Sequence, residues 1–181
     1  VSQDSTMFNF TSGNSQAYVR TLFPLQAIHR VIGGPASRWV EVDNLTFTNT
    51  QKVENAEVRR QLGMYRVEIE STANNYLSVI QPRSLSEGEN LVTLIESDTI
   101  IGANISARDM VLFSKNESAI IDASVSVDTK MLSELFITDL LPETSYDVLY
   151  DDTSIHIVQG DGNYVSTNQG TLHVMVSVDT N

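Results

Sequence analysis

The chain has 181 residues and a formal net charge of -12, from 11 Lys and Arg against 23 Asp and Glu. This acidic balance excludes nucleic acid and anionic membranes as expected partners, because binding to either depends on neutralising phosphate charge. The absence of cysteine excludes disulfides, thiolate metal sites and a cysteine nucleophile.

The length predicts a single domain over residues 1–181, with any internal boundary expected near 115–130. A chain of this size buries about 70% of the surface that its unfolded form exposes, so it needs no covalent staple. The sequence begins at Val1, its first residues do not form a signal peptide, and no apolar run approaches the length of a membrane span. We therefore expect a fragment of a longer protein.

Alternation of apolar and polar residues with period two predicts half-buried strands along most of the chain. In the first half it is clearest where Tyr65, Val67 and Ile69 alternate with charged residues. Thr50–Gln61 has the only helical character, and we predict a polar loop or a short turn of helix there. The strands predicted in this half are Ala17–Leu22, Arg38–Val42, 65–69 and Asn75–Ile80.

The second half continues the same alternation, and turn signals rich in Gly, Asn and Asp separate its segments. About ten short strands with such punctuation predict an all-β fold, an antiparallel β-sandwich. The strands predicted in this half are Asn90–Ile95, Ile100–Ile105, Asp109–Ser114, 124–128, Leu135–Thr138, 146–150, Ser154–Val158 and 172–178.

The segment Leu140–Val148 has the sequence Leu-Leu-Pro-Glu-Thr-Ser-Tyr-Asp-Val and resembles the tyrosine corner of immunoglobulin-like and fibronectin-type domains. In that corner a tyrosine ring packs under a loop and its hydroxyl bonds to the backbone. Tyr146 is the residue expected to do this. Two further strands follow, so the ending favours a sandwich over a barrel.

His156 and His173 are the candidate metal ligands. Each lies between two apolar residues of a predicted strand, which places it on the solvent face. On adjacent strands the two could bind a metal with Asp151 or Asp161, whereas the alternative is a pair of ordinary exposed histidines. Asp151 and Asp161 also offer oxygens to calcium, but the other carboxylates of a calcium loop are missing, which favours a solvated hairpin tip. We therefore predict no cofactor, with calcium as the one ion considered.

No catalytic residue is predicted. His29 lies in a segment expected to be a loop and could act as a general base, but the local sequence supplies no partner for it. Serine is plentiful, yet the Gly-x-Ser-x-Gly elbow of a hydrolase does not occur.

Trp39 is the candidate platform for a sugar ring. If Val40 and Val42 face the core, Trp39 lies on the opposite face beside carboxylates, where it could stack on a pyranose. The alternative is that Trp39 packs against a neighbouring domain. Arg59, Arg60 and Arg66 are the closest that the sequence comes to a basic cluster. They are therefore the candidate contacts for an acidic sugar.

The string Tyr18–Pro35 has the sequence Tyr-Val-Arg-Thr-Leu-Phe-Pro-Leu-Gln-Ala-Ile-His-Arg-Val-Ile-Gly-Gly-Pro. It is similar to a pattern in the C-terminal β-rich part of heparinase II/III-like polysaccharide lyases, from which it departs at Ala36, where the family has glycine. Two later motifs of the family are matched by Met64–Ile69, with Tyr65 in place of tryptophan, and by Tyr76–Pro82, with Ser78 in place of histidine. The resemblance extends through Ile101–Ile105 and Val111–Ser114.

This resemblance implies the C-terminal module of a secreted or periplasmic bacterial lyase that cleaves a uronate polysaccharide, with alginate preferred, by β-elimination. The family's catalytic motifs do not lie in the matching segments, so no catalytic residue is carried over. We expect a non-catalytic accessory module that packs against the catalytic domains and helps them fold or stay folded. The alternative is a carbohydrate-binding module for an acidic polysaccharide, and the least favoured reading is a stand-alone β-sandwich lyase.

Overall fold

The computed structural model describes residues 2–3, 6–33, 38–42, 45–48 and 65–176, with side chains described for 6–31 and 67–176. Every regular element in these residues is a β-strand, which confirms the predicted all-β fold. Within the same residues, nothing forms a helix that is long and apolar enough to span a membrane.

The chain divides into two compact units, an N-terminal unit of Val1–Glu89 and a C-terminal unit of Asn90–Asn181. The prediction of one domain with any boundary near 115–130 differs from this division. Residues 115–121 connect a strand of one sheet of the C-terminal unit to a strand of its other sheet. The range 115–130 therefore lies inside the C-terminal unit and includes one of its strands, Asp122–Ser126.

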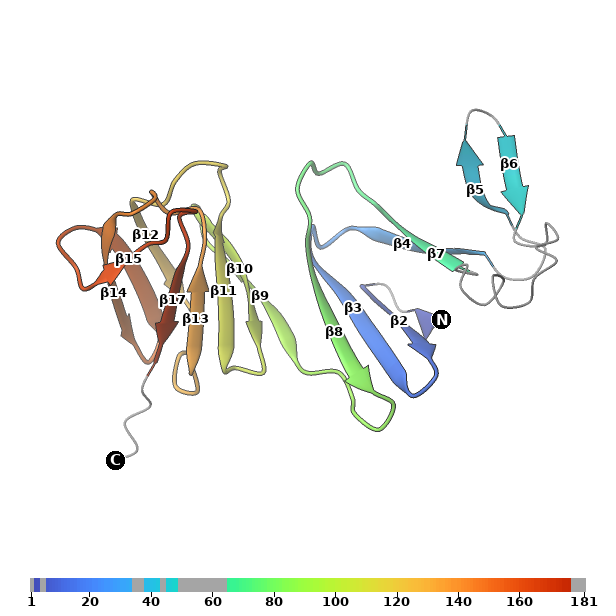
Figure 1. Cartoon of the computed structure of the whole chain (residues 1–181), viewed down its shortest axis with the longest axis horizontal. Helices are drawn as coiled ribbons and strands as arrows, with labels where there is room; N and C mark the ends of the chain where they lie inside the picture. The colour runs from blue at the N-terminus through green and yellow to red at the C-terminus, as the bar shows by residue number, and fades with distance from the viewer. Residues whose placement is uncertain (1, 4–5, 34–37, 43–44, 49–64, 177–181) are drawn as a thin grey trace. The chain divides into compact units, whose positions relative to one another are not determined.

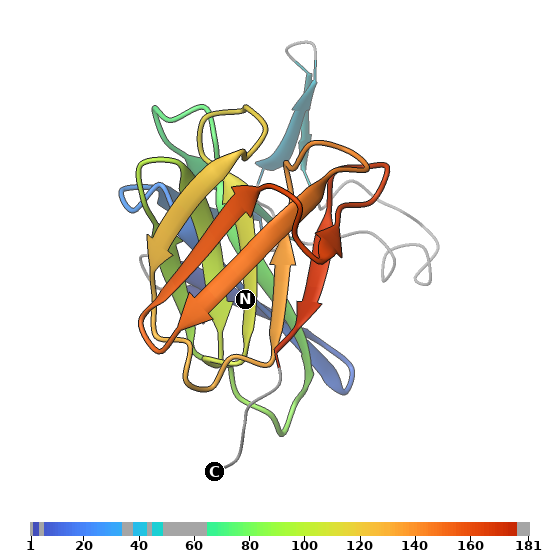
Figure 2. The same ribbon diagram turned by 90° about the vertical axis from the view of Figure 1, so that its left-hand side faces the viewer.

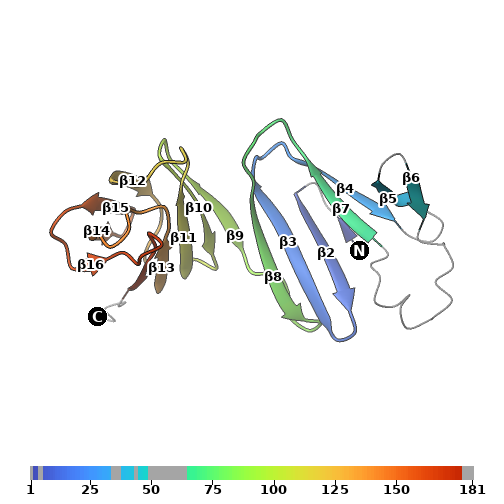
Figure 3. The same ribbon diagram turned by 45° about the horizontal axis from the view of Figure 1, so that its top comes forward.

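The N-terminal unit is built on a four-stranded antiparallel sheet in the order β1-β2-β3-β8 (Figures 1 and 3). Two two-stranded ribbons complete the described part of this unit, β4 with β7 and β5 with β6. Its small core holds Phe8, Val19, Leu22 and Ala27. The strands are β1 (Ser2–Gln3), β2 (Met7–Ser12), β3 (Ser15–Phe23), β4 (Ile28–Gly33), β5 (Arg38–Val42), β6 (Leu45–Thr48), β7 (Tyr65–Glu70) and β8 (Leu77–Ser84).

The C-terminal unit is a sandwich of two sheets, which Figure 2 shows one behind the other. The five-stranded sheet has the order β17-β13-β11-β10-β9, and the four-stranded sheet has the order β12-β15-β14-β16. Neighbouring strands are antiparallel except β11 and β13, which are parallel. The strands are β9 (Val92–Glu96), β10 (Ile100–Ile105), β11 (Asp109–Ser114), β12 (Asp122–Ser126), β13 (Glu134–Ile137), β14 (Ser145–Asp151), β15 (Ser154–Gln159), β16 (Tyr164–Val165) and β17 (Leu172–Met175).

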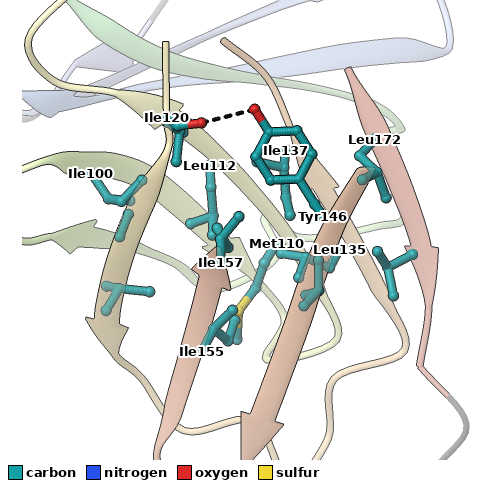
Figure 4. Packing of buried hydrophobic residues seen from close by; sticks show 14 of the residues in the cluster. Ile100, Met110, Leu112, Ile120, Leu135, Ile137, Tyr146, Ile155, Ile157 and Leu172 are labelled. Atoms are coloured by element: carbon teal, nitrogen blue, oxygen red, sulfur yellow. Dashed lines mark hydrogen bonds between the residues drawn. The ribbon is translucent and has the colours of Figure 1, made fainter. Parts of the chain in front are cut away.

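Alternate residues of both sheets fill the core between them (Figure 4). Leu135 and Ile137 come from the five-stranded sheet, Ile155 and Ile157 come from the four-stranded sheet, and each is at most 1% exposed. Burying an aliphatic side chain of this size stabilises the fold by about 1.5–3 kcal/mol. The C-terminal unit therefore has a continuous core of its own.

Tyr146 closes the core at one end and confirms the predicted tyrosine corner. Its side chain is fully buried, and its hydroxyl donates to the Ile120 carbonyl at 3.0 Å (dashed in Figure 4). The same hydroxyl accepts from the Leu141 N–H at 2.9 Å. Because the Tyr146 hydroxyl both donates and accepts a hydrogen bond, the phenol can be buried in this apolar interior without an unsatisfied polar group.

Candidate functional site

The five-stranded sheet of the C-terminal unit carries apolar side chains on both of its faces. Residues that pair directly across adjacent strands share a face. While Leu112, Leu135 and Val174 point into the core, the residues next to them in sequence lie on the opposite side, which we call the apolar outer face. One row across all five strands of this face is Leu94, Ala103, Val111, Phe136 and His173.

A second row on the apolar outer face is parallel to the first and consists of Val92, Ile105, Asp109, Glu134 and Met175. Exposure rises across the sheet, from buried or half-buried residues on β9 and β10 to 38% at Phe136 and 65% at Met175. A face of this kind in contact with water is unfavourable, because burial of apolar surface is the main driving force of association. Its β13–β17 end is thus the best candidate for contact with another molecule or domain.

His173 lies at this exposed end and contacts both a ring and a carboxylate. Its imidazole stacks on the Phe136 ring, with centroids 4.2 Å apart and planes inclined by 6°. Its Nε2 lies 3.2 Å from Oε2 of Glu134, and the His173 and Glu134 side chains are 44% and 39% exposed. A titratable pair therefore borders the most exposed apolar residues of the sheet.

The four-stranded sheet has the opposite character on the side that faces away from the core, which we call the polar outer face. The three strands β12, β15 and β14 form a grid in which only Leu149 and Val158 are apolar. The other members of the grid are Asp122, Ser124, Ser126, Asp147, Asp151, Ser154 and His156. Carboxylates and hydroxyls on this face are stably hydrated, so it requires no covering partner.

The predicted metal ligands do not come together. His156 lies on β15 of the four-stranded sheet and His173 on β17 of the five-stranded sheet, so the adjacent strands that the metal hypothesis required do not occur. His156 instead has its Nε2 2.9 Å from Oδ1 of Asp122. In the part of the chain that the structure describes, no group of three or more His, Asp or Glu is placed to hold a metal ion.

Asp151 stabilises a turn. Its Oδ1 accepts from the Thr153 N–H at 2.8 Å and from the hydroxyls of Thr153 and Ser154, each at 3.0 Å. The Thr153 backbone N–H is the main reason that the pKa of the Asp151 carboxyl lies below its ordinary value. Asp161 is exposed in the loop that follows β15, so the two aspartates occupy separate loops.

The predicted sugar contacts stay predictions. Arg59 and Arg60 lie outside the described residues. Trp39 and Arg66 lie in β5 and β7, respectively, but their side chains are outside the described part.

His29 was expected in a loop, and this expectation is wrong. It belongs to β4, is 5% exposed, and has its Nε2 2.9 Å from the Thr21 hydroxyl. The Phe8 ring meets its imidazole edge-on at 5.8 Å. The Ile-His-Arg-Val-Ile segment pairs with β7, so the imidazole is a core side chain of the N-terminal unit and is not placed to meet a substrate.

The N-terminal unit contains a groove of about 680 Å³. Phe23, Pro24 and Ile28 supply apolar surface, and Gln26, Glu70 and Thr72 supply polar groups. Glu70 is already engaged, since its Oε2 lies 3.1 Å from Nη2 of Arg30. The groove therefore has no uncompensated charge that would select a ligand.

The apolar outer face escaped the sequence analysis, although a signal for it exists. Asp109–Ser114 contains the uninterrupted run Met-Val-Leu-Phe, and Glu134–Ile137 contains Leu-Phe-Ile. Apolar residues at consecutive positions indicate a strand covered on both faces.

Comparison with known proteins adds no relative to this picture: no family model matches the sequence, and no curated protein matches it significantly.

Proposed function

We propose that the chain is a non-catalytic accessory module of a polysaccharide lyase and that it packs against the catalytic domains of that enzyme through the apolar outer face. One observation carries the proposal, namely that the five-stranded sheet is apolar on both faces while Phe136 and Met175 remain exposed. A second apolar face on one sheet is typical of a layer that has another layer to cover it.

The resemblance of Tyr18–Ser114 to the C-terminal part of heparinase II/III-like lyases is the reason that we propose catalytic domains as the partner of the apolar outer face. In such an enzyme, secreted or periplasmic in a bacterium, the module would cover part of the catalytic domains. A module that binds the folded catalytic domains but not their unfolded form stabilises the folded form by mass action. The module would therefore assist folding without catalysing any reaction. The substrate of the parent enzyme would be a uronate polysaccharide, with alginate preferred.

The energetic argument is that docking removes Phe136 and Met175 from water. Complete burial of side chains of this size is worth about 1.5–3 kcal/mol each, of which only part remains to be gained where a residue is already partly covered. Contacts of this magnitude alter the stability of a catalytic domain measurably, because domains are stable by only about 5–15 kcal/mol.

The test compares two aspartate substitutions in the full-length natural protein that contains this chain. Phe136→Asp places a carboxylate on the apolar outer face. Leu149→Asp is the matched control, because Leu149 is 60% exposed on the polar outer face. We expect Phe136→Asp to lower the melting temperature of the catalytic domains by several degrees and Leu149→Asp to leave it unchanged.

The isolated chain completes the test. In residues 1–181 alone, both variants should unfold within a degree or two of the parent chain, since neither residue lies in the core. A similar loss from both substitutions in the full-length protein would contradict the proposal. So would unsaturated-product formation by the isolated chain, which would make it a lyase, and so would stoichiometric heat on titration with alginate oligosaccharides, which would make it a carbohydrate-binding module.

A further inference from the structure

We infer that the ion pair between Arg20 and Glu89, which we call the latch, sets the length of the joint between the two compact units of the chain. With the latch formed, the joint is no longer than the single residue Asn90. Without it, the joint lengthens to Gly88–Asn90 and each unit reorients more freely. The inference concerns a connection within this chain, so it is independent of the partner proposed for the apolar outer face.

The joint is short because each unit holds its own end of the segment that connects β8 to β9. Glu89 is the last residue of the N-terminal unit, and its carboxylate contacts Arg20 on β3. Two positions further along the chain, the Leu91 carbonyl accepts a hydrogen bond from the Ser106 N–H of the C-terminal unit at 2.8 Å. Asn90 is therefore the one residue between these two contacts.

The latch has the geometry of a strong ion pair. Arg20 donates through Nε to Oε1 of Glu89 at 2.6 Å and through Nη2 to Oε2 at 2.8 Å. Its Nη1 donates to the Thr6 hydroxyl at 3.2 Å, which orients the guanidinium. The two charged side chains are only 25% and 18% exposed, so salt screens them less than it screens a surface pair. Because bidentate charge-assisted bonds restrict both distance and orientation, Glu89 is held against β3.

A second set of contacts holds the first part of the connecting segment without the latch. Gln16 donates through Nε2 to the carbonyls of Ser84 and Glu87, at 3.0 Å and 2.6 Å. The Glu87 carboxylate accepts from the N–H and the hydroxyl of Ser84 at 3.0 Å and 2.8 Å. The Leu85 N–H donates to the Asn14 carbonyl at 3.2 Å. Loss of the latch therefore releases only the residues that follow Glu87.

Gly88 makes the released residues flexible. A side-chain carbon added at this position would meet nothing within 4 Å, so the surroundings leave it open, and glycine has the widest range of backbone conformations. The lengthened joint Gly88–Asn90 spans up to about 10 Å when extended, against about 3.5 Å for Asn90 alone. This additional reach is the reason that each unit reorients more freely once the latch is broken.

The experiment measures nitrogen relaxation of the backbone amides by NMR in the 181-residue chain, for the wild type, Arg20→Gln and Glu89→Gln. In the wild type we expect order parameters at Gly88 and Glu89 near the value of about 0.85 that is typical of rigid backbone. In both variants we expect them to fall below about 0.6, the range of flexible segments. The rotational correlation time of each unit should also shorten, because a longer joint lets the units tumble more independently.

Two further variants separate the attraction between charges from side-chain packing. The double variant Arg20→Glu with Glu89→Arg restores an ion pair of reversed polarity, so it should return the order parameters toward those of the wild type. Lys115→Gln is the matched control, because it breaks an ion pair with Glu96 that has the same 2.6 Å separation but lies within the C-terminal unit. It should leave the order parameters of residues 88–90 unchanged.

Amide hydrogen exchange shows whether the change is local. The N–H groups of Leu85 and Glu87 should stay protected in Arg20→Gln, because the Asn14 and Ser84 carbonyls still accept from them. Loss of their protection would overturn the inference, since the segment would then detach as a whole instead of lengthening after Glu87. Order parameters at Gly88 that are already below about 0.6 in the wild type, or that are unchanged in both single variants, would overturn it as well.

Discussion

The two sheets of the C-terminal unit share one core but differ on the sides that face away from it. The outward row of the five-stranded sheet contains Leu94, Val111 and Phe136, whereas the outward grid of the four-stranded sheet is dominated by Asp and Ser. Both sheets bury their inner residues equally well. The difference therefore does not serve the stability of the sandwich itself, and it is the reason that we assign the proposed contact to the five-stranded sheet.

The same contrast separates two histidine–carboxylate pairs. His173 with Glu134 borders the apolar outer face, and His156 with Asp122 lies on the polar one. The two histidine side chains are almost equally exposed, at 44% and 43%, whereas Glu134 is 39% and Asp122 70% exposed, so the pairs differ in what surrounds them and in the exposure of the carboxylate. This makes the molecule its own control for the effect of environment on a titratable pair.

The largest effect is expected from a substitution in the core that the two sheets share. Ile155→Ala removes a fully buried side chain and leaves a cavity, so we expect the isolated chain to lose about 2–5 kcal/mol of unfolding free energy. Leu149→Ala, on the neighbouring strand but on the polar outer face, should change it by less than about 0.5 kcal/mol. Urea denaturation followed by circular dichroism measures both. Equal losses would mean that Leu149 is covered, and the comparison of the two faces would fail.

The strand pattern in the C-terminal unit was predictable because most of its strands alternate. Ile100–Ile105 and Asp109–Ser114 form strands with the predicted bounds, and Tyr146 makes the hydrogen bonds expected of a tyrosine corner. These features depend on local sequence, namely period, turn residues and one short motif. Local information therefore sufficed for the elements and for the sandwich class.

Strand neighbours were not predictable in the same way. His156 and His173 were considered as partners on adjacent strands, but β13 and β11 pair with each other in parallel, and β17 joins their sheet instead of the one that contains β15. Such pairing depends on contacts distant in sequence, which no local pattern encodes. β4 was missed because Ile28, Val31 and Ile32 do not alternate strictly and the segment precedes Gly33-Gly34-Pro35.

A smaller effect should distinguish the outer faces in the isolated chain. Met175→Ser removes a side chain that is 65% exposed on the apolar outer face, so it should reduce binding of the dye ANS, which reports accessible apolar surface. Val165→Ser, at a residue that is 62% exposed on β16 of the other sheet, should reduce it less. Fluorescence at fixed protein concentration makes the comparison, with unfolding curves to show that both variants remain folded. A greater reduction from Val165→Ser would place the accessible apolar surface elsewhere.

The smallest expected effect lies on the polar outer face, where Asp151 accepts hydrogen bonds from Thr153 and Ser154. The Thr153 N–H lowers the pKa of this carboxyl in the folded chain, so the ionised form stabilises the fold. That contribution is fully present above the carboxyl's unfolded pKa, about 3.9 for aspartate, and it is lost as the pH falls through the lower, folded pKa. Asp151→Asn should therefore lower the melting temperature slightly at pH 7, and the difference from wild type should shrink progressively as the pH falls below about 4. Because the carboxylate is exposed, solvent screening keeps the effect small. Melting curves at pH 7, 4 and 3 test this, and a difference that persists undiminished at pH 3 would show that Asp151 acts by packing or by turn geometry instead of by its charge.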